Sequence, residues 1–207
     1  MYEKSTPKQL IAPETKLVQI GNRIPQDFFV TSGVGESDIT IHAGSFHLAL
    51  REAGIERFNI MRYSSILPAI AQEIPRDSYR GTHGEVMETI MACADVERNP
   101  IDGLESHVKR ATAGIIFGWL HNKATRERYG GLVCEYSGHE TEQFAERSLR
   151  ASLNELHVNG FSDEFNISDV KLVTRSVVPK KRCGTALVAL CFTSYQAPIS
   201  MNGNEAP

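Results

Sequence analysis

The spacing of apolar side chains predicts two helices in a chain otherwise built of short strands. The clearer helix spans residues 141–158, where apolar positions recur every three or four residues: Phe144, Ala145, Leu149, Leu153 and Leu156. Acidic residues near its start and Gly160 after it are typical of helix ends. Its apolar stripe should cover one face of a sheet. A shorter helix is expected over residues 45–53, capped by Ser45 and ended by Gly54.

Apolar runs bounded by turn residues predict the strands. They lie at residues 16–20, 27–31, 131–137, 170–178 and 186–192. Residues 121–128 should form a polar hairpin connection, and residues 179–184 a basic turn that joins the last two strands as a closing pair. Residues 33–44 are rich in Gly, Ser, Asp and Thr, which predicts a loop. Its Gly33 and Gly35 lack the third glycine and the βαβ unit of a dinucleotide site.

Two segments stay ambiguous when only their periodicity is considered. Residues 84–93 fit a strand or a helix, and residues 111–120 form an apolar run typical of a strand buried on both faces or of a buried helix. Several strands combined with two firm helices indicate an α/β class with a mostly antiparallel or mixed sheet.

Length and charge narrow the range of functions. A chain of 207 residues, 41% hydrophobic and 23% charged, is expected to form one domain over residues 1–207, with a polar, extended arm at residues 1–14. The net charge of −3 is not gathered into a basic stripe, so we expect no nucleic-acid partner and no membrane partner. The chain shows no apolar run of bilayer length and no apolar signal core at its start, so we expect a cytoplasmic protein.

Cysteine and histidine spacing gives no sign of a metal site. The four cysteines lack C-x-x-C spacing and stand in apolar contexts, which predicts buried free thiols: Cys93, Cys134, Cys183 and Cys191. The seven histidines form no H-x-x-x-H or H-E-x-x-H arrangement. We therefore expect no bound metal.

Candidate chemistry centres on two adjacent serines, Ser64 and Ser65, inside the apolar stretch 58–68. Serine forms strands poorly, and its hydroxyl needs a hydrogen-bond partner when it leaves water. The pair therefore marks either a strand end, where the hydroxyls bond nearby backbone before Pro68, or a position where a hydroxyl is used chemically. The dipeptide alone leaves both interpretations open.

Four segments, in this order along the chain, resemble the pyruvoyl-dependent arginine decarboxylases. They read TSGVGE at 31–36, ALREAGI at 49–55, FNIMRYSSILP at 58–68 and CEYSG at 134–138. The resemblance covers roughly residues 25–195 and favours a strand for residues 84–93. It implies a four-layer αββα sandwich with mostly antiparallel or mixed sheets, as in the pyruvoyl-dependent histidine and arginine decarboxylases. It also implies a homotrimer of αβ units with sites at the interfaces.

The resemblance further implies self-cleavage between Ser64 and Ser65. In the family, the second serine's Oγ attacks the preceding carbonyl, the resulting ester eliminates, and the new end hydrolyses to a pyruvoyl group with loss of ammonia. The products here would be a β chain, residues 1–64, and an α chain, residues 65–207, whose pyruvoyl cofactor derives from Ser65. Its ketone would react with a substrate's amine and accept the electrons released with CO2. The implied reaction converts arginine to agmatine and CO2.

The resemblance assigns roles to two further residues. Glu135 matches the family's catalytic glutamate, and burial would raise its pKa so that it can protonate the α-carbon. Asn59 matches a position near the cleavage site and would orient the Ser64 carbonyl or the substrate.

His47 departs from the family pattern. Arginine-specific members place an aspartate at this position of the early helix, where it pairs with the substrate's guanidinium. A neutral imidazole lacks the charge, and a protonated one would repel guanidinium. Arginine use is then weak, or Glu36 or Asp38 compensates, or the substrate is a different amino acid. An interpretation from another class is an uncleaved, non-catalytic subunit.

Overall fold

The computed structural model describes residues 21–98 and 109–197, most of which lie in two sheets. The five-stranded sheet has the order β3 (Asn59–Arg62), β6 (Val86–Glu97), β10 (Cys183–Phe192), β2 (Asp27–Ser37) and β5 (Gln72–Glu73). The four-stranded sheet has the order β4 (Ile66–Pro68), β8 (Arg128–Gly138), β7 (Ala111–Asn122) and β9 (Phe165–Val177). Antiparallel pairs predominate, but β3 with β6 and β2 with β5 are parallel. The expected mixed α/β class is confirmed.

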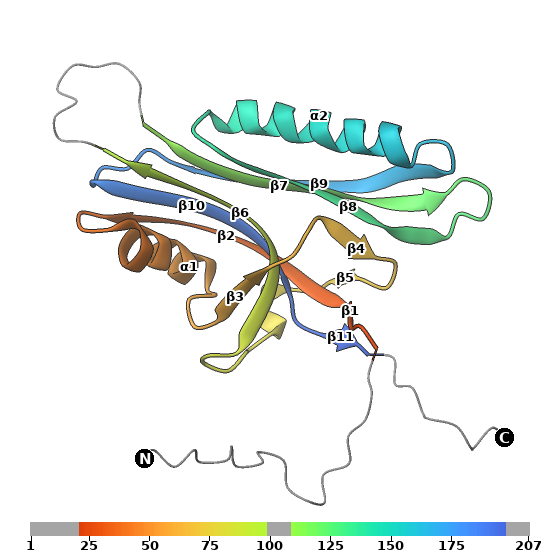
Figure 1. Ribbon diagram of the computed structural model, residues 1–207, viewed down its shortest axis with the longest axis horizontal. Coiled ribbons are helices and arrows are strands. Elements are labelled where there is room, and N and C mark those ends of the chain that lie inside the picture. The colour runs from red at the N-terminus through yellow and green to blue at the C-terminus, as the bar shows by residue number, and fades with distance from the viewer. Residues whose placement is uncertain (1–20, 99–108, 198–207) are drawn as a thin grey trace, which may run out of the picture.

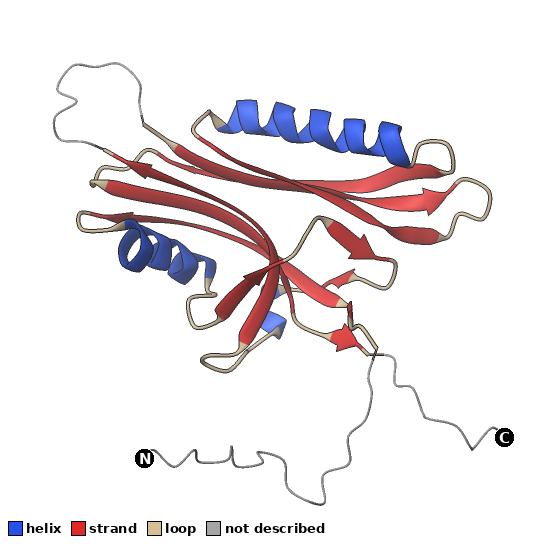
Figure 2. Cartoon of the chain, in the orientation of Figure 1, coloured by secondary structure: helices blue, strands red, loops and turns tan. Residues whose placement is uncertain are grey.

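The two helices lie on the outer faces of the two sheets, which face each other between them (Figure 1, Figure 2). Helix α1 (His47–Ala53) follows a π-helical turn, η1 (Ile41–Phe46), and packs on β2 and β10. Helix α2 (Glu142–Gly160) packs on β7, β8 and β9. Smaller elements complete the fold: the paired strands β1 (Ile24–Pro25) and β11 (Tyr195–Gln196), and the 3-10 turn η2 (Arg76–Ser78).

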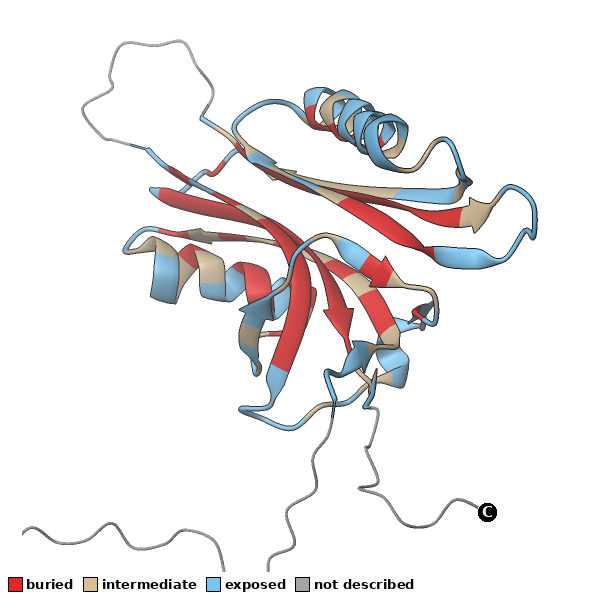
Figure 3. Cartoon of the chain, turned by 45° about the vertical axis from the view of Figure 1, so that its right-hand side comes forward, coloured by how far each residue is buried: buried red, intermediate tan, exposed pale blue. Residues whose placement is uncertain are grey.

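The main hydrophobic core fills the space between the sheets. Side chains from both inner faces form one cluster, which includes Phe28, Ile90, Val188, Leu190, Ile115, Phe117 and Val133. Strand β10 is buried along its whole length, and β7 is buried from Ala111 to Leu120 (Figure 3). The apolar run at residues 111–120 is therefore a strand covered on both faces. The segment 84–93 is a strand from Val86 onward, as the resemblance favoured.

Helix α2 follows the sequence pattern closely. The Thr141 side chain accepts a hydrogen bond from Phe144 N–H and caps the helix, and the buried face consists of Ala145, Leu149 and Leu153. The expected cover over one sheet face is confirmed. Gly160 is the last helical residue and not a left-handed stop, because Phe161 N–H still bonds the His157 carbonyl at 2.9 Å.

The loop predicted over residues 33–44 is wrong in its first part, because β2 continues to Ser37. A side chain at Gly33 would overlap the Ala49 carbonyl oxygen, and one at Gly35 would overlap the Ser45 carbonyl oxygen. These glycines therefore allow the α1 backbone to lie directly on the strand, a use of glycine inside strands that resembles a turn signal in sequence.

Ser45 does not cap the first helix as predicted. It lies inside η1, fully buried, and its Oγ hydrogen-bonds Thr185 Oγ1 of β10 at 2.9 Å. The hydroxyl is used for tertiary packing because the chain already turns helically from Ile41. Gly54 ends α1 in the left-handed region, at φ 69°, as predicted.

The two strands predicted as a closing pair, at residues 170–178 and 186–192, correspond to β9 and β10 and are not partners. β9 pairs with β7 in the four-stranded sheet, whereas β10 pairs with β2 and β6 in the other sheet. β10 is buried at every position, and it takes a central place with a strand on each of its edges. The strand predicted at 16–20 and the arm predicted at 1–14 lie outside the described residues.

Candidate active site

The link between Ser64 and Ser65 crosses from one sheet to the other. It connects β3, an edge strand of the five-stranded sheet, with β4, an edge strand of the four-stranded sheet (Figure 1). On one side, Tyr63 N–H donates to the Thr89 carbonyl of β6 at 2.7 Å. On the other side, Val133 N–H of β8 donates to the Ser65 carbonyl at 3.0 Å. Because each end is anchored to a different sheet, the dipeptide is held in a defined position.

The Ser65 hydroxyl and the preceding carbonyl both have partners. Ser65 Oγ donates to Glu135, at 2.8 Å from Oε2 and 3.0 Å from Oε1. Ile66 N–H donates to the Ser64 carbonyl oxygen at 3.1 Å, which closes a three-residue turn around Ser65. An acceptor on the hydroxyl makes its oxygen more nucleophilic, and a donor on the carbonyl polarises it. The strand-end interpretation does not describe Ser65, whose hydroxyl bonds a side chain 70 positions away.

Glu135 lies on β8, two residues after Val133 and on the same face of the strand. Val133 is buried in the core between the sheets, whereas Glu135 is exposed. The burial that we expected to raise its pKa is therefore absent within one chain. The neighbouring Cys134 thiol has a raised pKa, first because of its burial and second because of the Glu135 charge.

Asn59 is not brought to Ser64 within one chain. Its side-chain Nδ2 donates to the Gly84 carbonyl at 2.7 Å, and its N–H donates to the Glu85 carbonyl at 2.9 Å. These bonds pin the start of β3 to the turn before β6. The exposed side chain stands at the end of β3 farther from Ser65.

His47 is exposed at the start of α1, on the outer face of the five-stranded sheet. Among the described residues, the hydrogen-bond partners of Ser65 belong to β8, and none comes from α1. The structure of one chain therefore does not unite His47 with the serine.

The two acids considered as substitutes for an aspartate are engaged elsewhere. Glu36 Oε2 accepts hydrogen bonds from Lys180 N–H, at 2.5 Å, and from Lys181 N–H. Asp38 accepts from Arg182 N–H at 3.4 Å and lies 3.9 Å from the Lys181 ammonium. Both carboxylates thus hold the link between β9 and β10.

Comparison with known proteins places this chain in a family. The model of the pyruvoyl-dependent arginine decarboxylase family matches residues 27–197. The chain belongs to this family. It is similar to pyruvoyl-dependent arginine decarboxylases of Methanocella arvoryzae, 34% identical over 59% of this chain and 68% of the relative, and of Chlamydia caviae, 30% identical over 85% and 94%. A relative from Picrophilus torridus is 30% identical over 75% of this chain and 86% of its own length.

Family membership confirms several expectations drawn from the sequence. The pyruvoyl-dependent arginine decarboxylases are carboxy-lyases, and their prosthetic group is formed from a serine. The surroundings of Ser65 fit such a group. Val133 N–H donates to the Ser65 carbonyl, β4 pairs with β8, and all of these residues follow the Ser64–Ser65 bond in the sequence. Residues of one continuous fragment, 65–207, would therefore keep the group in place.

Sequence reasoning missed the backbone donors of the site. The Ile66 and Val133 N–H groups contact the Ser64 and Ser65 carbonyls, and backbone groups leave no residue-type signal. Ser137, from the same CEYSG segment as Glu135, was also not singled out. Its Oγ accepts a hydrogen bond from Cys93 N–H at 3.0 Å, which ties the end of β8 to β6.

Three further features bear on the sequence expectations. The four cysteines are free thiols, as predicted, although Cys93 and Cys134 are only partly buried. Within residues 21–98 and 109–197, no group of three metal-ligating side chains is placed to hold a metal ion. Nor does any helix in these ranges have the length and apolar character needed to cross a membrane.

Proposed function

We propose that the protein cleaves itself between Ser64 and Ser65 and then decarboxylates arginine to agmatine. The observation that carries this proposal is the pairing of Ser65 Oγ with Glu135 beside a Ser64 carbonyl that accepts the Ile66 N–H. A nucleophile with an acceptor and an electrophile with a donor are the parts that an acyl shift requires.

The cleavage chemistry follows from these contacts. Glu135 accepts the hydroxyl proton as Ser65 Oγ bonds to the Ser64 carbonyl carbon, and the Ile66 N–H stabilises the negative charge on the carbonyl oxygen. The C–N bond breaks, the nitrogen gains a proton, and an ester replaces the amide. Loss of the Ser65 α-proton then expels the Ser64 carboxylate. Addition of water and departure of ammonia leave the pyruvoyl group at the start of the fragment 65–207.

In the decarboxylation, the pyruvoyl group supplies an electron sink for the bond to CO2. The residues of the chain supply position and a proton. Val133 N–H keeps the carbonyl at residue 65 fixed, and Glu135 is released from the serine hydroxyl once that hydroxyl is gone. Its carboxyl then lies beside the reacting atoms and can deliver a proton to the α-carbon.

A homotrimer of αβ units would complete this site. Three apolar side chains near the cleavage segment are exposed in the single chain: Met61 of β3 at 52%, Ile66 of β4 at 59% and Val86 of the neighbouring β6 at 52%. Exposed apolar side chains around an active site favour burial by another copy. Such packing would also bury Glu135 and bring the exposed Asn59 or His47 of one copy toward the serine of the next.

The remaining details of the proposal concern substrate and compartment. Glu36 and Asp38 already accept hydrogen bonds from the backbone of residues 180–182, so they are poor candidates for the partner of the substrate's guanidinium. Because His47 stands where the family has an aspartate, a different amino acid is the second candidate substrate. The four free thiols favour a reducing, cytoplasmic location.

The Ser65→Ala variant tests the cleavage. The native protein should give a fragment of about 7 kDa, from ~110 Da per residue, and a larger one on a denaturing gel. Ser65→Ala should fold yet stay full length and inactive, and Ser64→Ala should still cleave, because the attacking hydroxyl remains. Two fragments from Ser65→Ala would overturn the assignment, and a full-length native protein would favour the non-catalytic subunit.

A further inference from the structure

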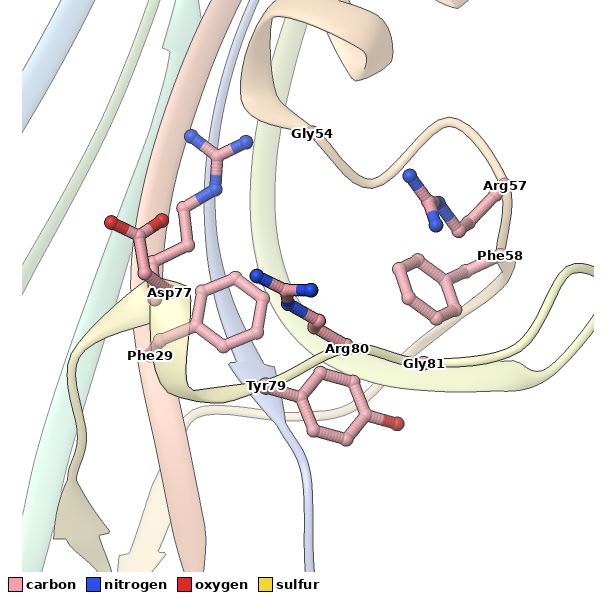
Figure 4. A pocket seen from close by; sticks show the side chains of 9 residues that line it. Phe29, Gly54, Arg57, Phe58, Asp77, Tyr79, Arg80 and Gly81 are labelled. Carbon is pink, nitrogen blue, oxygen red and sulfur yellow. The ribbon is translucent and has the colours of Figure 1, made fainter.

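A concave pocket separate from the Ser65 site is lined by residues from β2, from the link between α1 and β3, and from the segment around η2 (Figure 4). Its volume is about 550 Å³, within the range of small-molecule sites. Three arginines and three aromatic side chains dominate the lining: Arg57, Arg76, Arg80, Phe29, Phe58 and Tyr79. Neither Ser65 nor Glu135 takes part in it.

The three guanidinium groups lack acidic partners within residues 21–98 and 109–197. The ion pairs formed in these ranges involve Arg23, Lys171, Arg175, Lys181 and Arg182. No side-chain hydrogen bond engages Arg57, Arg76 or Arg80 in the same ranges. Arginine is usually solvated or paired, so three unpaired side chains around one pocket concentrate positive charge there.

The nearby carboxylates offset this charge only in part. Glu85 lies beside Gly81 at the pocket edge, and hydrogen bonds from the Tyr79 hydroxyl and from Thr82 N–H hold its pKa below the usual value, so its carboxylate stays negative. Asp77 is the only acidic residue in the described lining, and Figure 4 shows its carboxylate on the side away from Arg57. Three guanidinium groups against the carboxylates of Asp77 and Glu85 still leave a net positive pocket.

The walls of the pocket are formed before any ligand arrives. Phe58 and Tyr79 stack with ring centroids 6.2 Å apart, and Tyr79 also contacts Phe29 at 6.3 Å. Gly54 adopts φ 69°, and the Arg76 guanidinium lies where a side chain at Gly54 would project. Figure 4 shows that Arg57 extends from the link between α1 and β3, and Arg80 from the segment that follows η2.

We propose that this pocket binds a small molecule that carries a diphosphate group. The planar guanidinium fork matches phosphate oxygens in pairs, and three such forks around one pocket offer contacts to more than one phosphate group. The aromatic rings offer a surface for a planar ring attached to the phosphates. The ligand is therefore inorganic pyrophosphate or the diphosphate of a nucleotide. The proposal does not depend on cleavage at Ser65.

Calorimetric titration of the full-length protein with inorganic pyrophosphate, without divalent cations, tests this assignment. The native protein should bind, and the double variant Arg57→Gln/Arg80→Gln should lose affinity by about tenfold or more, since two charge-assisted contacts are removed. The matched control is Arg147→Gln/Arg150→Gln, which removes the same charge from exposed positions on α2 and should bind as the native protein does. Titration with ADP decides the ligand: tighter binding than pyrophosphate assigns a nucleotide, and equal binding assigns the free diphosphate.

The charge-conserving variant Arg57→Lys/Arg80→Lys separates fork geometry from charge. It should bind pyrophosphate with an affinity between those of the native protein and the glutamine variant. If circular dichroism shows that the glutamine variant is not folded, the affinity of the lysine variant still tests the role of the two arginines. Absence of binding to the native protein, equal affinities in the native, lysine and glutamine proteins, or an equal loss in the α2 control would each overturn the proposal.

Discussion

Replacing Glu135 with alanine should slow self-cleavage, because it removes the side chain that bonds the Ser65 hydroxyl. A hydrogen bond to a charged group contributes about 1.5–3 kcal/mol. If that contribution is lost from the transition state, cleavage slows by roughly one to two orders of magnitude, at about tenfold per 1.36 kcal/mol. Glu135→Gln keeps an oxygen acceptor at the same position and should slow cleavage less. Glu155→Gln removes an exposed carboxylate from α2 and serves as the charge control.

The rate is measured by pulse-labelled translation in vitro, followed by gel separation of full-length chain and fragments over time. Thermal denaturation of each variant checks that the fold is retained. A Glu135→Ala protein that cleaves at the native rate would refute the assigned contact. Equal slowing of Glu155→Gln would show that the loss reflects overall charge and not the bond to Ser65.

Three other outcomes are expected. After cleavage, Glu135→Gln should lower kcat for decarboxylation by about 10²–10⁴-fold, because the N–H protons of an amide are too weakly acidic for general acid catalysis. Release of CO2 measures this rate, and near-normal turnover would show that Glu135 does not deliver the proton. His47→Asp should raise kcat/KM for arginine by about one to two orders of magnitude, because it restores a carboxylate that can pair with the guanidinium. The rate of agmatine formation measures this. Efficient arginine turnover by the native protein with no gain in the variant would show that His47 does not face the guanidinium. Burial and the Asp95 charge, partly offset by Arg62, raise the pKa of Cys93 from 9.0 to about 11. At pH 8 the thiolate form of Cys93 should thus be about a hundredfold less populated than that of an ordinary thiol, so its alkylation should be correspondingly slow. Peptide mass spectrometry measures the extent of alkylation over time. Alkylation of Cys93 at the rate of free cysteine would contradict this prediction.

The elements with a single, strong period were predictable from sequence. Helix α2 repeats its apolar residues every three or four positions, and its Thr141 cap is a local signal. The extent of β2 was not predictable, because Gly33 and Gly35 serve a contact with α1 that only the tertiary fold reveals. The partners of β9 and β10 were equally hidden, since a basic link can join one hairpin or two sheets.

The candidate site shows the same division. Ser65 and Glu135 were found through matched motifs, and the fold unites them although 70 positions separate them. The donors on the Ser64 and Ser65 carbonyls are backbone N–H groups, which any residue could supply. Asn59 and His47 remain predictions, because one chain does not bring either to the serine. The three pocket arginines are spread over residues 57–80, where nothing in the sequence marks them as neighbours.

Mass spectrometry of the large fragment's N-terminus tests the central claim most directly. The account predicts a fragment that begins at position 65 with a pyruvoyl group, lighter than a serine terminus by one ammonia, and that reacts with a carbonyl reagent such as a hydrazine. The same measurement on Ser65→Ala should find only intact chain. A native large fragment that begins with an unmodified serine, or a native chain that stays whole, would contradict the account.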